Sequence, residues 1–323
     1  MSGPRIVTLT VNPAVDVAAE AEEVRPVHKI RTFGEHYDPG GGGINVARVV
    51  HELGGDTLAV FAAGGVTGRF VEEMLSQASV PTRCISIRGP TRISLTVREQ
   101  ASGAEYRFVP QGPRLDAAEC TSILDALGAL EADWLVASGS LPPGVPPEFY
   151  ASVAQLAVQR GVKFALDTSG AALKALLGHG VDLLKPSLGE FESIAGRANS
   201  DPSSRARQAV DLVRSGAARM IALTLGADGA ILATADGALQ LPAMAVKERT
   251  GVGAGDSFLA ALVLGLARGQ PGDEALQLAI AAGAAAVAGS GTARVKRAEV
   301  EALYRGIRTG MSEQPIGAPI SGA

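Results

Sequence analysis

A regular alternation of apolar runs with longer amphipathic segments constrains the fold of this chain more than any other feature. From residue 116 to residue 308, runs typical of strands alternate with segments typical of helices. Strands connected through helices require right-handed crossovers, which build a parallel sheet covered by helices on both faces. The expected strands lie at 6–11, 57–63, 134–137, 162–167, 181–184 and 220–224, followed by a hairpin at 230–241. The expected helices lie at 46–54, 67–77, 147–160, 171–178, 188–195, 201–215, 255–268, 273–288 and 296–308.

A second group of segments has a different period and predicts a separate, smaller sheet. Its members, at 84–88, 92–98 and 106–109, alternate polar and apolar side chains, as antiparallel strands with one solvated face do. Residues 29–38 are expected to join them, although 17–37 otherwise reads as irregular. We expect one domain over 1–310, with the small sheet within 28–38 and 84–110, and a disordered tail at 311–323.

Composition and charge exclude several classes of function. The net charge is −4 and no basic stripe is present, which argues against a nucleic-acid partner. The longest apolar stretch, 276–288, is short and rich in Ala and Gly, so no membrane span is expected. Residues 1–11 enter a strand directly, so no signal peptide is expected either. We therefore expect a cytoplasmic protein with no membrane or nucleic-acid partner.

The stretch 250–258 places three glycines within five residues, directly before a buried helix. Glycine lets a ligand approach the backbone, and the helix that follows puts Gly253, Ala254 and Gly255 at a helix N-terminus. Free N–H groups and the helix macrodipole favour an anion there, usually a phosphate. Asp256 has two open interpretations. It could take a proton from an attacking hydroxyl, or it could be an ordinary first-turn acid.

A run of four glycines at 40–43 is a second place where a ligand could approach the backbone. The run directly precedes the helix expected at 46–54, which favours a binding loop over a flexible hinge. It is not a dinucleotide fingerprint, because the G-x-G-x-x-G spacing and the preceding strand are both missing.

Polar residues follow several expected strands, where the ligand crevice of an open α/β sheet forms. Asp16 comes after the first strand and Lys185 after the strand at 181–184. The turns 138–140 and 224–229 supply Ser, Thr and Gly at two other strand ends. Each is routine alone, but their joint placement indicates a binding site.

Two further groups of polar residues have both a structural and a functional interpretation. Arg31, Arg92 and Arg107 belong to the small sheet, and a lone exposed arginine is usually just solvated. Three on one sheet could instead hold a phosphate, because guanidinium groups match phosphate oxygens. The spacing of Ser187 and Glu190 is that of a helix capping box, which spacing alone favours, but Glu190 could also orient Mg²⁺ through water.

These stretches together resemble the ribokinase-like carbohydrate kinases, the PfkB family, and are most similar to its minor, type 2, 6-phosphofructokinases. The matching stretches are 9–16, 39–48, 138–144, 185–190 and 252–257, and they run over almost all of residues 5–308. Two glycine motifs in this order, separated by Ser-Gly-Ser-Leu-Pro-Pro-Gly, form a highly specific pattern. The resemblance implies a three-layer αβα, Rossmann-like core with a small β-sheet lid, and a homodimer formed through the lids.

The resemblance implies an enzyme that transfers the γ-phosphate of MgATP to a hydroxyl of a sugar phosphate. Asp256 would be the base, and Gly253, Ala254 and Gly255 would hold the transferred phosphate. With fructose 6-phosphate, the acceptor is the 1-hydroxyl and the product is fructose 1,6-bisphosphate, as in glycolysis. The implied cofactors are Mg²⁺ and a K⁺ beside the anion hole, with ATP as co-substrate.

The motifs and the resemblance together give three sets of candidate ligands. The candidates for the sugar and its phosphate are Asp16, Lys29, Arg31, Gly41, Gly42, Asn45, Arg92, Arg107 and Ser140. Those for the nucleotide are Lys185, Ser187, Thr224, Gly226 and Gly229, with Glu190 holding Mg²⁺ through water. Those for K⁺ are Thr250, Val252, Ala286, Gly289 and Gly291. Lys29 and Arg107 could act across the dimer.

The chain departs from the family pattern at two positions, since Ser187 and Ser94 each replace an Asn. The stretch 105–109, Glu-Tyr-Arg-Phe-Val, is similar to the 6-phosphofructokinase version and favours fructose 6-phosphate. The alternatives are 1-phosphofructokinase or tagatose-6-phosphate kinase activity, or, in a different class, a non-catalytic sensor of sugar phosphates or nucleotides. The helix N-terminus is further expected to lower the pKa of Asp256 and to leave it a weak base.

Overall fold

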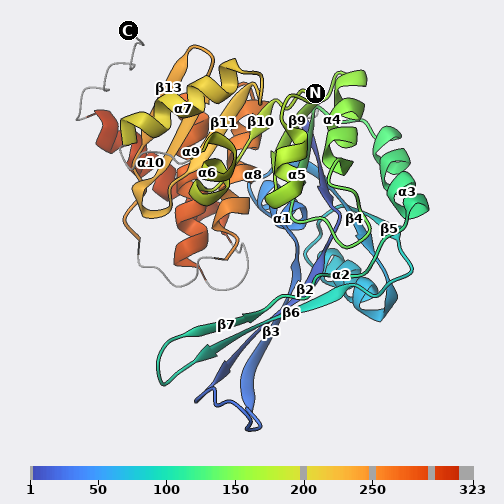
Figure 1. Cartoon of the computed structure of the whole chain (residues 1–323). Coiled ribbons are helices and arrows are strands. Elements are labelled where there is room, and N and C mark those ends of the chain that lie inside the picture. Colours follow the sequence, from blue (N-terminus) through green and yellow to red (C-terminus); the bar gives the residue numbers. More distant parts are fainter. Residues whose placement is uncertain (1–2, 197–201, 247–251, 290–294, 313–323) are drawn as a thin grey trace.

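The structure, a computed structural model, describes residues 3–196, 202–246, 252–289 and 295–312. Figure 1 shows a body in which helices cover a sheet, and a second sheet that projects from the body. The strands are β1 (Arg5–Thr10), β2 (Ala14–Ala21), β3 (Thr32–Gly40), β4 (Asp56–Ala63), β5 (Thr82–Ser86), β6 (Arg92–Glu99), β7 (Glu105–Phe108), β8 (Trp134–Ser138), β9 (Lys163–Asp167), β10 (Leu183–Leu184), β11 (Met220–Thr224), β12 (Ala230–Thr234) and β13 (Gly237–Leu241). The helices are α1 (Gly42–Glu52), α2 (Gly65–Gln77), α3 (Ala117–Gly128), α4 (Phe149–Gln159), α5 (Gly170–Leu176), α6 (Leu188–Ala195), α7 (Pro202–Arg214), α8 (Ala254–Ala267), α9 (Gly272–Ala288) and α10 (Arg297–Ser312), with a 3₁₀ turn at Gly226–Asp228.

The main sheet confirms the predicted α/β fold. In the described part of the chain it has nine strands in the order β13-β12-β11-β10-β9-β8-β1-β4-β5. All neighbours from β11 to β5 pair in parallel, and the antiparallel hairpin β12–β13 completes one edge. Helices α3 to α7 cover one face, and α1, α2, α8, α9 and α10 cover the other. Because both faces are covered, the central strands are almost continuously apolar.

Helix α8 is apolar on nearly every side because it is enclosed by protein. Its residues from Ser257 to Gly265 are all buried, between the sheet, α1 and α9. A helix enclosed in this way cannot shift without disturbing two packed layers. The first turn of α8, which contains Asp256, therefore has a rigid support.

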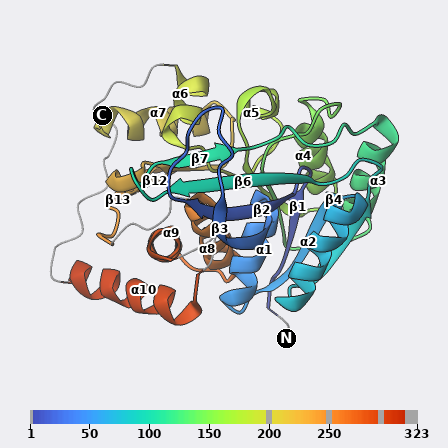
Figure 2. The same ribbon diagram turned by 90° about the horizontal axis from the view of Figure 1, so that it is seen from below.

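The second sheet, which we call the lid, has the order β3-β2-β6-β7. Figure 2 shows these four strands side by side. Two predictions about the lid were wrong. Residues 84–88 do not belong to it, because β5 pairs in parallel with β4 at the edge of the main sheet. The lid is also mixed rather than antiparallel, since β2 and β6 run parallel. A half-buried edge strand alternates polar and apolar residues in the same way as a lid strand does.

Strand β2 was missed, and with it the true position of Asp16. Residues 17–37 were expected to be mainly irregular, yet β2 covers Ala14–Ala21 and pairs with both β3 and β6. Four of its eight residues are alanine, which has a low strand propensity and weakens the alternating pattern. Asp16 thus lies within an inner strand of the lid rather than in a loop after β1.

The glycine run 40–43 is a place of close packing and not a hinge. Gly40 ends β3, and α1 begins at Gly42. A Cβ on Gly42 would lie 2.0 Å from Oγ of Ser138, and one on Gly43 would lie 2.3 Å from the carbonyl oxygen of Leu9. Side chains at these positions would push the start of α1 away from β1 and β8. The glycines therefore fix the position of Asn45, one turn into α1.

No helix among the described residues is both long and apolar enough to cross a membrane.

Candidate active site

The carboxylate of Asp256 lies where α1, α8 and the end of β8 meet. Asn45 of α1 donates from Nδ2 to Oδ2 of Asp256 at 2.9 Å. Ser138, the last residue of β8, donates from Oγ to Oδ1 at 3.1 Å. The carboxylate is thus held through both oxygens by side chains from two other elements. Such a fixed position suits a group that must meet a substrate proton in one geometry.

The pKa of Asp256 is raised, and the expectation that it would be lowered was wrong. It is raised to about 6, first by burial and then by the nearby charge of Asp167. The hydrogen bonds from Asn45 and Ser138 and the charge of Lys185 act in the opposite direction. The loss of hydration outweighs the helix dipole, which acts only through the first turn and is worth about 1 kcal/mol. Asp256 is therefore a better base than an exposed aspartate.

A buried ion pair lies next to this carboxylate. Nζ of Lys185 is 3.1 Å from Oδ2 of Asp167, and their side chains are 5% and 17% exposed. Burial alone would lower the pKa of Lys185, but Asp167, Asp256 and Glu190 outweigh this effect and raise it. Burial raises the pKa of Asp167, an effect that Lys185 partly offsets. Lys185 is thus the cation shared by three carboxylates.

Asp167 was not among the predicted site residues, and Ser138 was predicted only as part of the turn 138–140 at a strand end. Each ends a strand of the main sheet, β9 and β8 respectively, at the edge where ligands bind. Asp167 had been assigned to its strand but given no role.

The first turn of α8 separates two cavities. One, which we call the lid cavity, has a volume of about 710 Å³ and is lined by Asp256, Gly253 and the inner face of the lid. The other, the α8–α9 cavity, has about 410 Å³ and is lined by Ala254 and Gly255 from the opposite side. A group at the start of α8 is therefore reachable from both cavities. Gly253, in the left-handed conformation with φ of 81°, caps this helix.

The lid cavity collects most of the residues predicted to bind the sugar. Those that line it are Asp16, Gly41, Asn45, Arg92 and Arg107. Burial raises the pKa of Asp16 to about 6, against the opposing effect of Arg92. Arg92 also donates to the carbonyl oxygens of Pro110 and Asn12, at 2.8 and 2.9 Å, which holds it half-buried in place. The charged residues that line this cavity are Asp16, Glu20, Asp38, Glu105 and Asp256, together with Arg92, Arg98 and Arg107.

Four predicted sugar ligands do not line this cavity. Lys29 and Arg31 are exposed in the connection between β2 and β3, at the far end of the lid. Gly42 is packed against Ser138, as described above. Ser140 accepts a hydrogen bond from Nδ2 of Asn12 at 3.3 Å.

The α8–α9 cavity collects the predicted nucleotide turn. Thr224, Gly226 and Gly229 line it. Its apolar wall comes from α8, α9 and the segment after β13, with the residues Met244, Val246, Phe258, Ile280, Ala284 and Val287. An apolar slot beside a glycine turn suits a planar base joined to a charged group.

Three of the remaining nucleotide and metal candidates, Lys185, Ser187 and Glu190, line neither cavity. Ser187 and Glu190 form the expected capping box, with Oε2 of Glu190 accepting from both N and Oγ of Ser187 at 2.7 Å. Val252 and Gly289 line the lid cavity, and Ala286 is buried near the end of α9. Thr250 and Gly291 lie outside the described residues. Within the described ranges, no three His, Cys, Asp or Glu side chains form a ready metal site.

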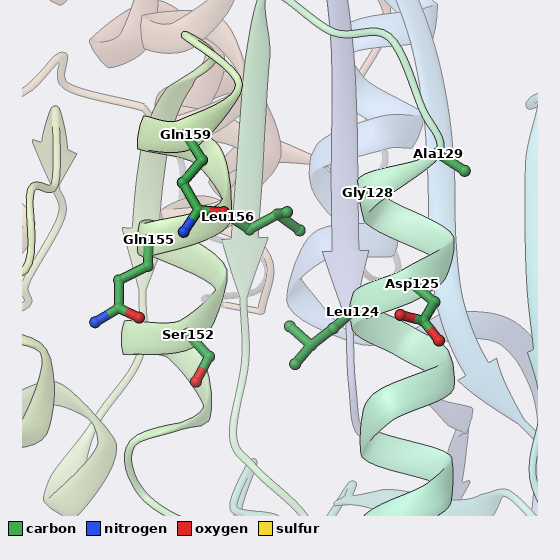
Figure 3. A pocket seen from close by; sticks show the side chains of 8 residues that line it. All are labelled: Leu124, Asp125, Gly128, Ala129, Ser152, Gln155, Leu156 and Gln159. Atoms are coloured by element: carbon green, nitrogen blue, oxygen red, sulfur yellow. The ribbon is translucent and has the colours of Figure 1, made fainter.

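A third cavity, shown in Figure 3, lies between α3 and α4, on the opposite face of the sheet from α8. It has about 500 Å³ and is a shallow surface groove. Its only titratable lining residue in the described chain is Asp125. It lacks the convergent charges of the other two cavities.

Comparison with known proteins agrees with this geometry. The model of the pfkB family carbohydrate kinases matches residues 9–298. The chain belongs to this family. It is therefore a sugar kinase.

Among curated proteins, the chain is 42% identical over 303 residues to the ATP-dependent 6-phosphofructokinase isozyme 2 of Mycobacterium tuberculosis, covering 93% of this chain and 89% of that protein. Among solved structures, it is similar to phosphofructokinase-2 from Escherichia coli in complex with potassium, with a TM-score of 0.90, 35% identity and coverage of 94% and 99%. The same enzyme in complex with fructose-6-phosphate matches with a TM-score of 0.89 and 34% identity, at the same coverage.

Proposed function

We propose that this kinase transfers the γ-phosphate of MgATP to the 1-hydroxyl of fructose 6-phosphate, giving fructose 1,6-bisphosphate. The observation that carries the proposal is the first turn of α8, which faces one cavity with Gly253 and Asp256 and the other with Ala254 and Gly255. A phosphoryl donor in the α8–α9 cavity and an acceptor in the lid cavity would meet at this turn. The relatives described above, which act on or bind fructose 6-phosphate, supply the choice of substrate.

In this mechanism Asp256 accepts the proton of the attacking hydroxyl. A base whose pKa is about 6 is mostly ionised at neutral pH and close enough to it to be effective. The transition state of phosphoryl transfer is loose, and negative charge is spread over the three equatorial oxygens of the transferred group. The N–H groups at the start of α8 are already oriented and would stabilise that charge without rearrangement.

We propose that the site binds two cations, Mg²⁺ and K⁺. Mg²⁺, when bound with ATP, would neutralise the charge of the phosphates, and Glu190 would hold it through water. Glu190 fits because its carboxylate is close enough to raise the pKa of Lys185, which lies under the start of α8. A K⁺ would be held near Val252 and Gly289, together with Thr250, Ala286 and Gly291. The potassium complex of the similar enzyme supports this assignment.

The order of residues along the lid supports a sugar phosphate as the acceptor. Asp16 pairs with Ser94, and the next inward-facing pair, Ala18 and Thr96, leads to Arg107 on β7. From Asp256 outward, the ligand would thus meet a carboxylate for its hydroxyls and then an arginine for its phosphate. Arg107 lines the cavity of its own chain, so it does not need to reach across a dimer.

We further propose that the lids of two copies form a homodimer in the cytoplasm. The outer face of the lid exposes the apolar side chains of Tyr37, Ile93 and Phe108. Large exposed apolar side chains on one sheet mark a surface for a partner. Lys29 and Arg31, at the far end of the lid, would then approach the phosphate in the partner's cavity.

Replacing Arg107 tests the phosphate site. We expect Arg107→Ala to raise the KM for fructose 6-phosphate roughly 10- to 100-fold, because charge-assisted hydrogen bonds to the phosphate are lost. The KM for ATP should change little, since Arg107 does not line the α8–α9 cavity. Steady-state kinetics would measure both, with Arg83→Ala, an exposed arginine on β5, as control. An unchanged KM for the sugar would remove Arg107 from the site.

The pH dependence of kcat tests the assigned base. As the pH falls through about 6, Asp256 takes up a proton and kcat should fall with it. kcat at saturating substrate is the quantity to measure, because the sugar phosphate itself ionises near pH 6 and affects kcat/KM. Asp16 has a similar pKa, so Asp16→Asn is the control. This fall of kcat at low pH is the acid limb of the profile. If kcat of Asp16→Asn no longer falls at low pH, the acid limb belongs to Asp16.

The decisive experiment offers fructose 6-phosphate, fructose 1-phosphate and tagatose 6-phosphate in parallel, with MgATP, in a coupled assay of ADP release. The proposal expects the highest kcat/KM with fructose 6-phosphate. A preference for either other sugar would keep Asp256 and the two cavities but change the substrate. Binding of all three without turnover would indicate a sensor on the same fold.

A further inference from the structure

Asp256 is connected to the lid through three side chains. Asn45, which donates to Asp256, is followed one helical turn later by Arg48 on the same face of α1. Arg48 contacts Oδ1 of Asn45 with Nη1 at 3.5 Å. Its Nη2 lies 3.4 Å from Oδ1 of Asp38, on lid strand β3. The guanidinium thus spans from the lid to the amide that touches Asp256.

The chemistry of these groups gives the contact between Arg48 and Asn45 a direction. A guanidinium has only donors, whereas an amide has an acceptor end and a donor end. When Arg48 occupies Oδ1 of Asn45, the amide must turn its N–H groups toward Asp256. The positive charge of Arg48 beside Oδ1 also polarises the amide of Asn45 and strengthens the hydrogen bond that Nδ2 donates.

Arg48 is itself held from the lid side. The side chain of Asp38 is only 5% exposed, and the residue lines the lid cavity directly opposite Asp16 in the register of β2 and β3. Asp38 also lies 3.5 Å from Nε2 of His36. Two facing carboxylates in one cavity repel each other, so the one that does not contact the ligand needs a cation. The side chain of Arg48, 14% exposed, supplies that charge.

We propose that Arg48 is a positioning residue of this kinase, which is held by Asp38 of the lid and orients Asp256 through Asn45. The proposal rests on the proposed function of Asp256 as the base. It assigns Arg48 no contact with either substrate, and the residue does not line the lid cavity or the α8–α9 cavity. The lid strand that borders the sugar site is thereby connected to the base that acts on the sugar.

The test compares Arg48→Met, Arg48→Lys and Arg268→Met. Arg268 donates to the carbonyl oxygens of Leu53 and Gly54 at the other end of α1, both at 3.2 Å, so its loss disturbs the helix without touching the site. We expect Arg48→Met to lower kcat about ten-fold, because a misdirected base costs rate. The KM for ATP should not change. Arg48→Lys keeps the charge but not the span, and it should recover part of kcat.

The pH profile of kcat separates positioning from a merely structural role. The hydrogen bond from Asn45 lowers the pKa of Asp256, so weakening it should move the acid limb of Arg48→Met to higher pH. The other charged groups facing Asp256, Asp167 and Lys185, are unchanged in this variant. Arg268→Met should lose stability but keep the wild-type limb.

The outcomes distinguish this proposal from the proposed function. A wild-type kcat and acid limb in Arg48→Met, with Asp256→Asn inactive, would overturn the role of Arg48 alone. An active Asp256→Asn would overturn the base itself and, with it, this proposal. If Arg48→Met fails to fold, Asp38→Asn releases Arg48 from the lid and should show the same lower kcat and the same shift. Any effect of Asp38→Asn on the neighbouring Asp16 would appear in kcat/KM. An unchanged pH profile of kcat in Asp38→Asn would also overturn the proposal.

Discussion

Asp256→Asn is expected to lower kcat roughly a thousand-fold while both substrates still bind. A positioned general base contributes about 10²- to 10⁴-fold, and an amide cannot accept the proton. Asparagine has the shape of aspartate, and Ser138 can still donate to its Oδ1. The start of α8 keeps its N–H groups, so the proposed anion site remains. The coupled assay measures kcat, and calorimetric titration with fructose 6-phosphate and with ADP measures binding.

The matched control for this variant is Asp125→Asn. Asp125 is an exposed aspartate on α3 that lines the groove of Figure 3 and lies outside both cavities of the active site. It should keep wild-type kcat and binding. Near-normal turnover in Asp256→Asn would return Asp256 to the interpretation as an ordinary first-turn acid. Loss of binding of both ligands would mean that the carboxylate holds the site together rather than performing chemistry.

The main sheet could be predicted from the sequence because its signals are local. The runs at 134–137, 162–167 and 220–224 are each bounded by turn residues, and all are strands in the structure. The start of α8 could be placed for the same reason, since the glycines and the apolar helix that follows them are neighbours in sequence. The lid was harder, because β2 is rich in alanine and its pairing with β6 joins residues about 80 positions apart.

The pKa of Asp256 and the ion pair between Asp167 and Lys185 could not be obtained in this way. Both depend on the distance between β9, β10 and α8, which are separate in sequence and meet only in the folded chain. The sequence placed a carboxylate at a helix N-terminus, which by itself lowers a pKa. The fold adds burial and a second carboxylate, and these reverse the direction. Charge balance in a buried site is a property of the three-dimensional arrangement.

Lys185→Met is expected to destabilise the protein by about 3–5 kcal/mol, because it leaves the buried carboxylate of Asp167 without its cation. Methionine fills a similar volume, so the loss is mainly electrostatic. The double variant Asp167→Asn with Lys185→Met removes both charges and should recover much of that stability. Urea denaturation of the wild type, both single variants and the double variant would measure the coupling. A double variant as unstable as Lys185→Met would show that packing around Lys185, and not its charge, matters.

The loss in Lys185→Met should also depend on pH, in a direction set by Asp167. The folded-state pKa of Asp167 is already raised by burial, and removing Lys185 takes away the charge that opposes this rise. A carboxyl group with a raised folded pKa binds its proton more tightly when folded, so stability falls as the pH rises through that pKa. The variant should therefore lose more stability at pH 8 than at pH 5. A deficit that is equal at both values would mean that Asp167 keeps a counter-charge when Lys185 is gone.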